Sequence, residues 1–540
     1  MHNIQVTFDQ STANARSESS LVIDPANPLK MVAGSKKFTN PNTYDFTLAT
    51  SWSDDGGLSW HPSADLDITG WDGISDPALA YDDKGNFYLV ALPFKKQPDI
   101  VVIGIAVYKS TDGGKTWGKP QTIHTSAGDD KQWAAGDAWS ASYKGRVYAA
   151  WDDGSNLRFA RTRNGNSWEG AGNGTAVGTV IASGSFAPEI NVAKDGTIYV
   201  VYLSGTTVKL LVSTNGGDSF QQATAPATNI TTLGQTLPVV NGWSEFPGGS
   251  FRVLTLPTAC AGSGQTVAVA WADTRTGPAR TYYALSHDRG QTWQTGPSGQ
   301  PLLSTPIASN MQHFHPQLIA HGLTIACAFY EFGPKNGSML IDTIAATSID
   351  NGQSFTSQVV TDQPWDPAVD APWSHGDPQV TFIGDYFGID ASANGFYPLW
   401  TDTRTGIQEL FIDRVSALQV PKFDPNRWAI VAEILFGVTG DGGGAIRIGG
   451  KIIPIPPWDP DGPIRDILFA LATYQLVGGM GNVAEANALR RAAMASVSRM
   501  VSHETSVLGH QAVAPALAER GNGEAAVRAA ATHAAETPRA

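Results

Sequence analysis

A short motif recurs along this chain of 540 residues and constrains its fold more than any other feature. The motif has the form S/T-x-D/N-x-G-x-S/T-W/F. Successive copies start 57, 52, 51, 73 and 62 residues apart, which is the length of a four-stranded sheet with its connections. The sequence therefore predicts a repeat architecture. The copies begin at Ser53, Ser110, Thr162 (degenerate), Ser213, Ser286 and Ser348.

Each copy of the motif is expected to form a turn. A short Asp or Asn side chain caps its own turn through backbone N–H groups, and Gly takes the position with positive φ. The aromatic residue at the end then packs against the neighbouring sheet. We interpret these acidic and amide residues as turn supports and not as catalysts: Asp55, Asp112, Asn215, Asp288 and Asp350.

A second recurrent pattern is an apolar strand that ends in an aromatic residue followed by polar residues. GNFYLVALP, GRVYAAWDD and GTIYVVYLS are examples, MVAGSKKF is the first, and the unit from Gly384 to about Ala417 is the seventh. The seventh unit lacks a clear fourth strand, which the alternating NIQVTFD near the N-terminus would supply. The chain is therefore predicted to be all-β, a β-propeller of about seven four-stranded blades over residues 1–418, with six blades as the alternative.

Composition and charge narrow the classes of partner. The abundance of turn formers, 57 Gly and 33 Pro, suits many short strands. The net charge of −13 disfavours nucleic acid and membrane surfaces, and argues against a strongly anionic polymer. Cys260 and Cys327 have no metal-ligand spacing, so we expect no metal and no cofactor. With neither a visible secretion signal nor a membrane-length apolar run, the chain is expected to be soluble, and a secreted or extracellular location fits.

The character of the chain changes after Pro421. Residues 419–462 are interpreted as a Gly- and Pro-rich connector, and residues 463–540 as an Ala-rich helical region with a disordered tail. Helices are expected from Ile464 and over about Val483 to Met500. The segment GDGGGA lacks the Lys-Ser/Thr ending of a phosphate loop and is interpreted as a turn. Docking on the propeller, assembly, and attachment to a protein partner all stay open as roles for the helical region.

The candidate site lies at the mouth of the propeller channel opposite the repeated turns. We letter the strands of each blade A to D from the channel outward. At this mouth, the B–C loops and the crossings between blades are expected to surround the first residues of the inner strands, A. Alignment of these strand starts gives five titratable residues in seven positions, a costly arrangement for a purely structural channel. The aligned residues are Glu18, Asp76, Lys131, Ala187 (with Glu189 nearby), Leu256, His315 and Asp385.

Two further groups of residues are candidates for binding. The loops WADTRTG and WTDTRTG pair Asp273 with Arg275 and Asp402 with Arg404. The planar guanidinium group suits the carboxylate of an acidic sugar, and the equally weighted alternative is that each pair braces its own hairpin. The crossings add aromatic side chains whose faces suit sugars, although packing is the commoner role of such residues. These are Trp71, Trp133 and Trp373.

The repeated motif and the blade pattern resemble the sialidase (neuraminidase) superfamily and its Asp-box, or BNR-repeat, relatives. The resemblance implies a carbohydrate-active propeller in which Tyr386 would serve as nucleophile and Asp76 as acid, with Arg252 as a candidate third arginine. The chain departs from this family in two ways. The stretch NPLKMVAGSKKF has no Arg-Ile-Pro segment, and seven blades exceed the usual six.

Three functions are therefore kept open, all with a glycan or polysaccharide as the main partner. The first is a glycoside hydrolase that uses carboxyl groups from Glu18, Asp76 and Asp385, spaced about 5 to 9.5 Å apart. The second is a non-catalytic propeller that binds glycan or protein. The third is a polysaccharide lyase in which Tyr386 and His315 converge on one uronic acid.

Overall fold

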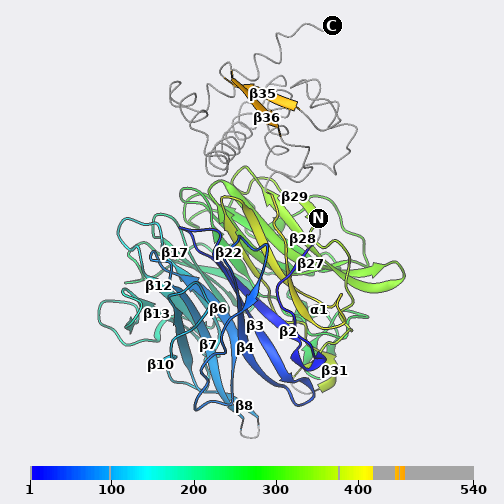
Figure 1. Cartoon of the computed structure of the whole chain (residues 1–540), viewed down its shortest axis with the longest axis horizontal. Helices are drawn as coiled ribbons and strands as arrows, with labels where there is room; N and C mark the ends of the chain where they lie inside the picture. Colours follow the sequence, from blue (N-terminus) through cyan, green and yellow to red (C-terminus); the bar gives the residue numbers. More distant parts are fainter. Residues whose placement is uncertain (1–2, 97–98, 375–376, 417–443, 449–450, 456–540) are drawn as a thin grey trace. The chain divides into compact units, whose positions relative to one another are not determined.

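The computed structural model describes residues 3–96, 99–374, 377–416, 444–448 and 451–455. Residues His2–Ala417 form one compact unit, and the chain from Leu418 onward belongs to another. The first unit is a β-propeller of seven blades whose sheets follow one another in sequence order (Figure 1). This confirms the predicted fold class and its blade count.

The first three blades each use a long inner strand and three strands further out. Blade 1 is β2 (Arg16–Ile23), β3 (Met31–Asn40), β4 (Asp45–Ser53) and β5 (His61–Pro62). Blade 2 is β6 (Gly73–Tyr81), β7 (Phe87–Lys96), β9 (Ile105–Ser110) and β10 (Gln121–His124), with β8 (Ile100–Val102) beside β7. Blade 3 is β11 (Asp130–Gly136), β12 (Val147–Asp152), β13 (Asn156–Thr162) and β14 (Trp168–Glu169), with β15 (Thr179–Ser183) beside β13.

The remaining blades repeat this order. Blade 4 is β16 (Phe186–Val192), β17 (Ile198–Ser204), β18 (Thr207–Ser213) and β19 (Gln221–Gln222). Blade 5 is β22 (Thr258–Ala261), β23 (Val267–Asp273), β24 (Arg280–Ser286) and β25 (Gln300–Pro301). Blade 6 is β26 (Gln312–His321), β27 (Thr324–Lys335), β28 (Ser338–Ser348) and β29 (Thr356–Val359). Blade 7 is β32 (Gly388–Ser392), β33 (Gly395–Asp402), β34 (Glu409–Ile412) and β1 (Ile4–Gln5).

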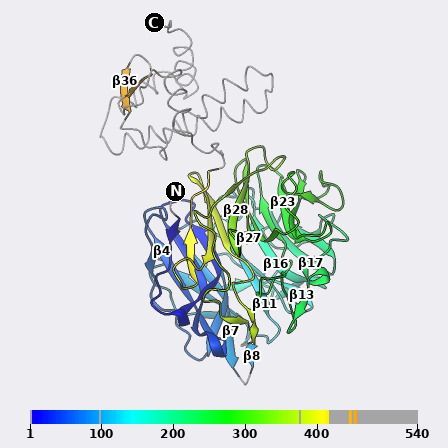
Figure 2. The same ribbon diagram turned by 90° about the vertical axis from the view of Figure 1, so that its right-hand side faces the viewer.

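The ring is closed by the N-terminal strand, as the sequence predicted. Strand β1 pairs antiparallel with β34, with Ile4 opposite Ile412, and the Val6 amide donates to the Leu410 carbonyl at 2.8 Å. The N-terminal and C-terminal parts of the propeller thus share blade 7 (Figure 2). Closure leaves β34 without an exposed edge.

The hydrophobic core lies between neighbouring blades. Ala78 and Val90 of blade 2 pack with Ala149 and Trp151 of blade 3 in one such layer. The second strand of each blade is buried on both faces, which explains why these strands read as continuous apolar runs.

The repeated motifs lie on the face of the propeller that also carries the A–B turns. The Asp55 carboxylate accepts the Leu58 and Ser59 amides at 2.9 and 3.0 Å, so it closes its own turn. The Gly56 amide of this motif donates to the Leu29 carbonyl in the A–B turn of the same blade at 2.9 Å. We call this surface the motif face.

Three connections link or interrupt the blades in ways that the sequence did not predict. The apolar run 101–110 does not form one strand: it is broken at Gly104, where φ is 144° and a Cβ would lie 2.0 Å from the His124 carbonyl oxygen. The crossing between blades 4 and 5 holds α1 (Leu233–Thr236), β20 (Val239–Val240) and β21 (Trp243–Ser244), and the crossing between blades 6 and 7 holds β30 (Trp373–Ser374) and β31 (Asp377–Thr381).

The second unit is described over one hairpin, β35 (Gly444–Ile448) and β36 (Lys451–Ile455). It falls in the segment that was interpreted as a connector. The helices expected from Ile464 and over Val483 to Met500 lie outside the described residues. Among the residues described, no helix is long and apolar enough to cross a membrane.

Candidate functional site at the channel mouth

Five of the seven inner strands carry a β-bulge at the same place. In β2 the pairing with β3 shifts between Ser17 and Ser20, and in β26 the pairing with β27 shifts between Phe314 and Gln317. Strands β6, β11 and β16 shift at the equivalent position. The residue at the centre of each bulge has a positive φ: Glu18 (52°), Asp76 (56°), Lys131 (47°), Ala187 (51°) and His315 (47°).

These are the positions that the sequence alignment of strand starts selected. The other two aligned residues, Leu256 and Asp385, lie just before β22 and β32. A non-glycine residue in the left-handed region costs about 1–2 kcal/mol, and such strain concentrates at functional sites. A bulge also redirects a side chain. The seven positions together form what we call the mouth.

Hydrogen bonds between blades hold the bulges in place. The Gln132 side-chain amide of blade 3 donates to the Asp76 carbonyl of blade 2. The Ser19 hydroxyl of blade 1 donates to the Leu399 carbonyl of blade 7 at 2.7 Å and accepts the Gly388 amide at 3.0 Å. The strained conformations are therefore fixed from neighbouring blades, and the mouth is preorganised.

A buried ion pair joins Glu18 to Lys36 on one side of the mouth. The Lys36 ammonium lies 2.8 Å from the Glu18 carboxylate, and its nitrogen lies 4.5 Å from the centre of the Phe382 ring. Burial raises the pKa of Glu18 to about 7, although Lys36 opposes this shift. Burial disfavours the charge on Lys36, but the Glu18 carboxylate outweighs it and raises the Lys36 pKa. Glu18 is therefore the partner that titrates near neutral pH.

A second ion pair joins Asp385 to Arg252. The guanidinium group binds both carboxylate oxygens, with Nε to Oδ1 at 3.0 Å and Nη2 to Oδ2 at 2.5 Å. Burial opposes ionisation of Asp385, but Arg252 lowers its pKa below the usual value. Asp385 therefore stays a carboxylate at neutral pH.

Asp76 belongs to blade 2, beside the Glu18 blade, and differs from both of these carboxyl groups. It is half-buried, and its side chain accepts the Ser75 hydroxyl at 2.5 Å. Among the described residues, no cation forms an ion pair with it. Its charge nevertheless acts on Glu18, Lys36 and Lys131, so Asp76 faces the same space. It is the carboxyl group most available to a ligand.

The opposite side of the mouth is apolar. The Tyr386 side chain comes from blade 7 and packs with Ala187 of blade 4 and Leu256 of blade 5. The Trp133 ring of blade 3 meets Tyr386 edge to face at 5.5 Å between ring centres. Burial raises the Tyr386 pKa well above its usual value, so this residue is a protonated phenol at neutral pH.

Two polar side chains of the mouth have no hydrogen-bond partner among the described residues. His315 is 2% exposed, both its ring nitrogens are unsatisfied, and burial lowers its pKa to about 4. The Lys131 ammonium lies 4.0 Å from the centre of the Tyr386 ring, and burial lowers its pKa. Unsatisfied buried polar groups are rare, so His315 is suited to meet a ligand, and the half-buried Lys131 ammonium adds a cation beside it.

In each of the two repeated loops, the arginine pairs with the aspartate of its own loop. Arg275 donates to the Asp273 carboxylate from Nε at 2.8 Å, and Arg404 donates to Asp402 from Nη2 at 2.6 Å. The backbone amide of each arginine donates to the same aspartate. These contacts correspond to the bracing interpretation of the two loops.

The other candidates from the sequence have structural contacts, either packing or hydrogen bonds between blades. Trp71 packs against the core between blades 1 and 2, and Trp373 lies in β30 opposite Thr381. Glu189 accepts the Ala259 amide at 3.1 Å and the Thr258 hydroxyl at 3.0 Å, which ties blade 4 to blade 5.

Sequence reasoning missed Lys36 and gave Arg252 only as an arginine candidate. Arg252 belongs to the long crossing between blades 4 and 5, where the Ser250 carbonyl accepts the Thr381 amide of the next long crossing at 2.8 Å. The 73-residue spacing between the motifs at Ser213 and Ser286 was the available signal of an insertion. No cluster of His, Cys, Asp or Glu suited to a metal ion occurs in the described part of the chain.

Comparison with known proteins gives structural neighbours only. No protein-family model matches the chain, and no curated protein does. A Hadza microbial sialidase is 13% identical, with a TM-score of 0.41 over 66% of this chain and 68% of that chain. The Trypanosoma rangeli sialidase in complex with the inhibitor DANA is 12% identical, with a TM-score of 0.38 over 64% and 57%. A leech intramolecular trans-sialidase is 10% identical, with a TM-score of 0.39 over 67% and 70%.

Proposed function

We propose that this protein is a carbohydrate-active enzyme that binds a glycan at the mouth and hydrolyses a glycosidic bond there. The observation that carries the proposal is the ring of aligned bulges. Glu18, Asp76, Lys131 and His315 all adopt the strained left-handed conformation at the same place in their strands, and such strain concentrates at functional sites. A structural channel has no need of this arrangement.

The two sides of the mouth suit the two faces of a sugar. The aromatic side, with Tyr386 and Trp133, offers surface for the C–H groups of a pyranose ring beside the Lys131 ammonium, which lies over both rings. The charged side offers carboxyl groups and cations for hydroxyl groups and for the glycosidic oxygen. This combination of apolar walls with a few converging polar groups is typical of small-molecule sites.

Asp76 is assigned as the group that protonates the leaving glycosidic oxygen. None of the described cations forms an ion pair with its carboxyl group, whereas Asp385 is held ionised by Arg252. The Asp385 carboxylate is then suited to stabilise the positive charge that develops on the sugar ring; water adds to the anomeric carbon, and its proton passes to the Asp76 carboxylate. Tyr386 is not assigned as nucleophile, because its raised pKa keeps the phenol protonated.

The test is a panel of aryl glycosides and anionic polysaccharides, assayed with the wild type, Asp76→Asn and Asp385→Asn. We expect at least one member to be turned over, with kcat reduced about 100-fold or more by Asp76→Asn. Asp112→Asn is the matched control, because Asn215 already fills the same position in another motif. Glycan binding without turnover of any member would favour the non-catalytic propeller instead.

A polysaccharide lyase is the second candidate, favoured by the unsatisfied and neutral His315. In this reaction His315 would take the proton from C5 of a uronic acid, the bond from C4 to the leaving oxygen would break as the C4–C5 double bond forms, and Tyr386 would protonate that oxygen. Lys131 would pair with the uronate carboxylate. Ultraviolet absorbance of an unsaturated product, lost in His315→Gln, distinguishes this reaction from hydrolysis.

A further inference from the structure

A cavity lies at the opposite end of the channel, on the motif face. This funnel has a volume of about 530 Å³ and is lined by residues from all seven inner strands and from most of their A–B turns. Ligand sites commonly have volumes of about 300–1,000 Å³. Trp133 lines the funnel and also packs on Tyr386 of the mouth, so it lies between the two sites.

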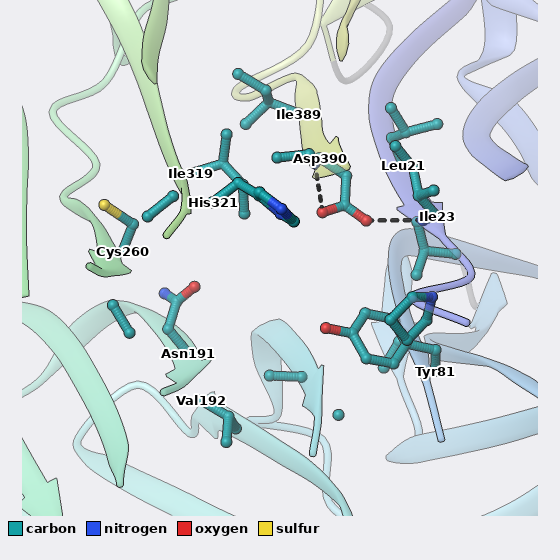
Figure 3. A pocket seen from close by; sticks show the side chains of 18 of the residues that line it. Leu21, Ile23, Tyr81, Asn191, Val192, Cys260, Ile319, His321, Ile389 and Asp390 are labelled. Carbon is teal, nitrogen blue, oxygen red and sulfur yellow. Dashed lines mark hydrogen bonds between the residues drawn. The ribbon is translucent and has the colours of Figure 1, made fainter. Parts of the chain in front are cut away.

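Polar side chains from different blades converge in the funnel (Figure 3). The Asp390 carboxylate accepts the Ile23 and Ala391 amides, both at 2.7 Å, which fixes its orientation. The His321 ring points toward Asp390, and the Tyr81 hydroxyl points into the cavity. Apolar side chains such as Ile319 also line this cavity.

The polar groups of the funnel are adapted to an uncharged ligand. Burial raises the pKa of Asp390 to about 7, so a large fraction of this carboxyl group is protonated at neutral pH. Burial and then the charge of Lys194 lower the pKa of His321, so its ring is neutral. A protonated carboxyl group and a neutral imidazole can each donate and accept a hydrogen bond, as the hydroxyl groups of a sugar require.

An exposed tryptophan stands in the A–B turn of blade 3, where it lines the funnel. Trp139 is 48% exposed, an unusual exposure for so large an apolar side chain. The Lys194 ammonium lies 5.4 Å from the centre of its ring. An accessible indole face beside hydrogen-bonding groups suits the C–H face of a sugar ring.

We propose that the funnel is a second binding site that takes a neutral sugar residue, stacked on Trp139 with its hydroxyl groups directed at Asp390 and His321. This site does not depend on the function proposed for the mouth. It would let the protein hold one sugar on the motif face while the mouth acts on another.

The test is calorimetric titration of the full chain with glucose, galactose, mannose and N-acetylglucosamine. We expect saturable binding of at least one of these sugars, weakened about tenfold or more by Trp139→Ala. Trp52→Ala is the matched control, because Trp52 also has a lysine over its ring, Lys115 at 4.1 Å, and does not line the funnel. Asp390→Asn keeps an acceptor for only one of the two amides and should also weaken binding.

The mouth variant Asp76→Asn separates this proposal from the proposed function. Binding that survives Asp76→Asn but is lost in Trp139→Ala supports a sugar site in the funnel, whether or not the mouth is catalytic. Two results would overturn the proposal: no saturable binding of any of the four sugars, or binding that is lost in Asp76→Asn and retained in Trp139→Ala.

Discussion

At the scale of single residues, the mouth is a set of charges whose states are determined by burial and by their partners. Glu18, Asp76 and Asp385 are all acidic, yet one carboxyl group has its pKa raised, one is unpaired, and one is held ionised by Arg252. Environments that separate the properties of neighbouring carboxyl groups are what acid–base catalysis needs. The residue types were readable from the sequence, but the pairings were not: Lys36 lies in the neighbouring strand of the same blade, and Arg252 comes from a distant crossing.

Loss of the Asp385 carboxylate should strongly destabilise the fold. Asp385→Ala leaves the Arg252 charge buried without this partner, and breaking a buried pair in this way costs about 3–5 kcal/mol. Urea unfolding measures the change in the free energy of unfolding. The control is Asp54→Ala, which removes an exposed ion pair with Lys115 and should cost less than about 1 kcal/mol. Equal costs for the two variants would contradict the buried pair.

His315 should make stability depend on pH. Its pKa is about 4 in the folded protein and 6.5 as a free side chain, so the unfolded chain binds the proton more tightly. The stabilisation is complete above pH 6.5 and is lost as the pH falls toward 4. From the shift in pKa, His315→Gln should remove up to about 3 kcal/mol of this dependence. Unfolding measured between pH 4 and 7 checks this, and identical curves for the two proteins would refute it.

At the scale of elements, each blade contains two kinds of special backbone, the inner-strand bulge and the outer turn motif, and they are stabilised differently. The turn motif is local, because each carboxylate closes its own turn within about five residues, so the sequence alone indicated it. The bulges depend on bonds between blades, such as that from Gln132 to Asp76. Their position followed from aligned strand starts, but their left-handed conformation did not.

Relief of strain at a bulge should offset the usual cost of glycine. Ala187 has a φ of 51°, so Ala187→Gly gains about 1 kcal/mol from the left-handed conformation while it loses a methyl group and adds backbone entropy. The net change should stay within about 1 kcal/mol of zero. Ala149→Gly in the regular strand β12, equally buried, gains no such relief and should cost more. The measurement is the change in the free energy of unfolding for each variant. A larger loss of stability in Ala187→Gly than in Ala149→Gly would contradict stored strain at the bulge.

The turn motif should tolerate amide but not apolar replacement. The Asp112 carboxylate accepts the Thr116 amide at 3.0 Å and its hydroxyl at 2.6 Å. Asp112→Ala should cost about 1–2 kcal/mol of stability, whereas Asp112→Asn should cost little, since Asn215 accepts the Ser219 amide at 3.0 Å in the same way. Thermal unfolding of both variants compares them, and the expectation fails if the two costs are equal.

At the scale of the whole molecule, pairing of β1 with β34 closes the ring of seven blades around one channel. The repeat spacing predicted the propeller and the closing strand because both depend on patterns along the chain. It did not predict the two joined crossings that bring Arg252 to Asp385, because their contact spans 133 residues of sequence. The funnel on the motif face was also missed, since its lining comes from every blade.

Removal of the closing strand should weaken the whole propeller. A chain that begins at Asp9 loses β1, the buried Val6, and the bond between Thr7 and Glu409. We expect a markedly lower unfolding temperature, because β34 then has a free edge. A chain that begins at Asn3 keeps these contacts and is the control. Equal unfolding temperatures for the two truncated chains would contradict closure by β1.

The central claim is that the mouth performs the chemistry while the opposite turn motifs support the fold. The most direct measurement is the turnover of a glycoside panel by the wild type, Asp76→Asn and Asp112→Asn under identical conditions. We expect turnover by the wild type and by Asp112→Asn, and a fall of about 100-fold or more in Asp76→Asn. Turnover that is unchanged in Asp76→Asn, or absent from the wild type on every substrate, would contradict it.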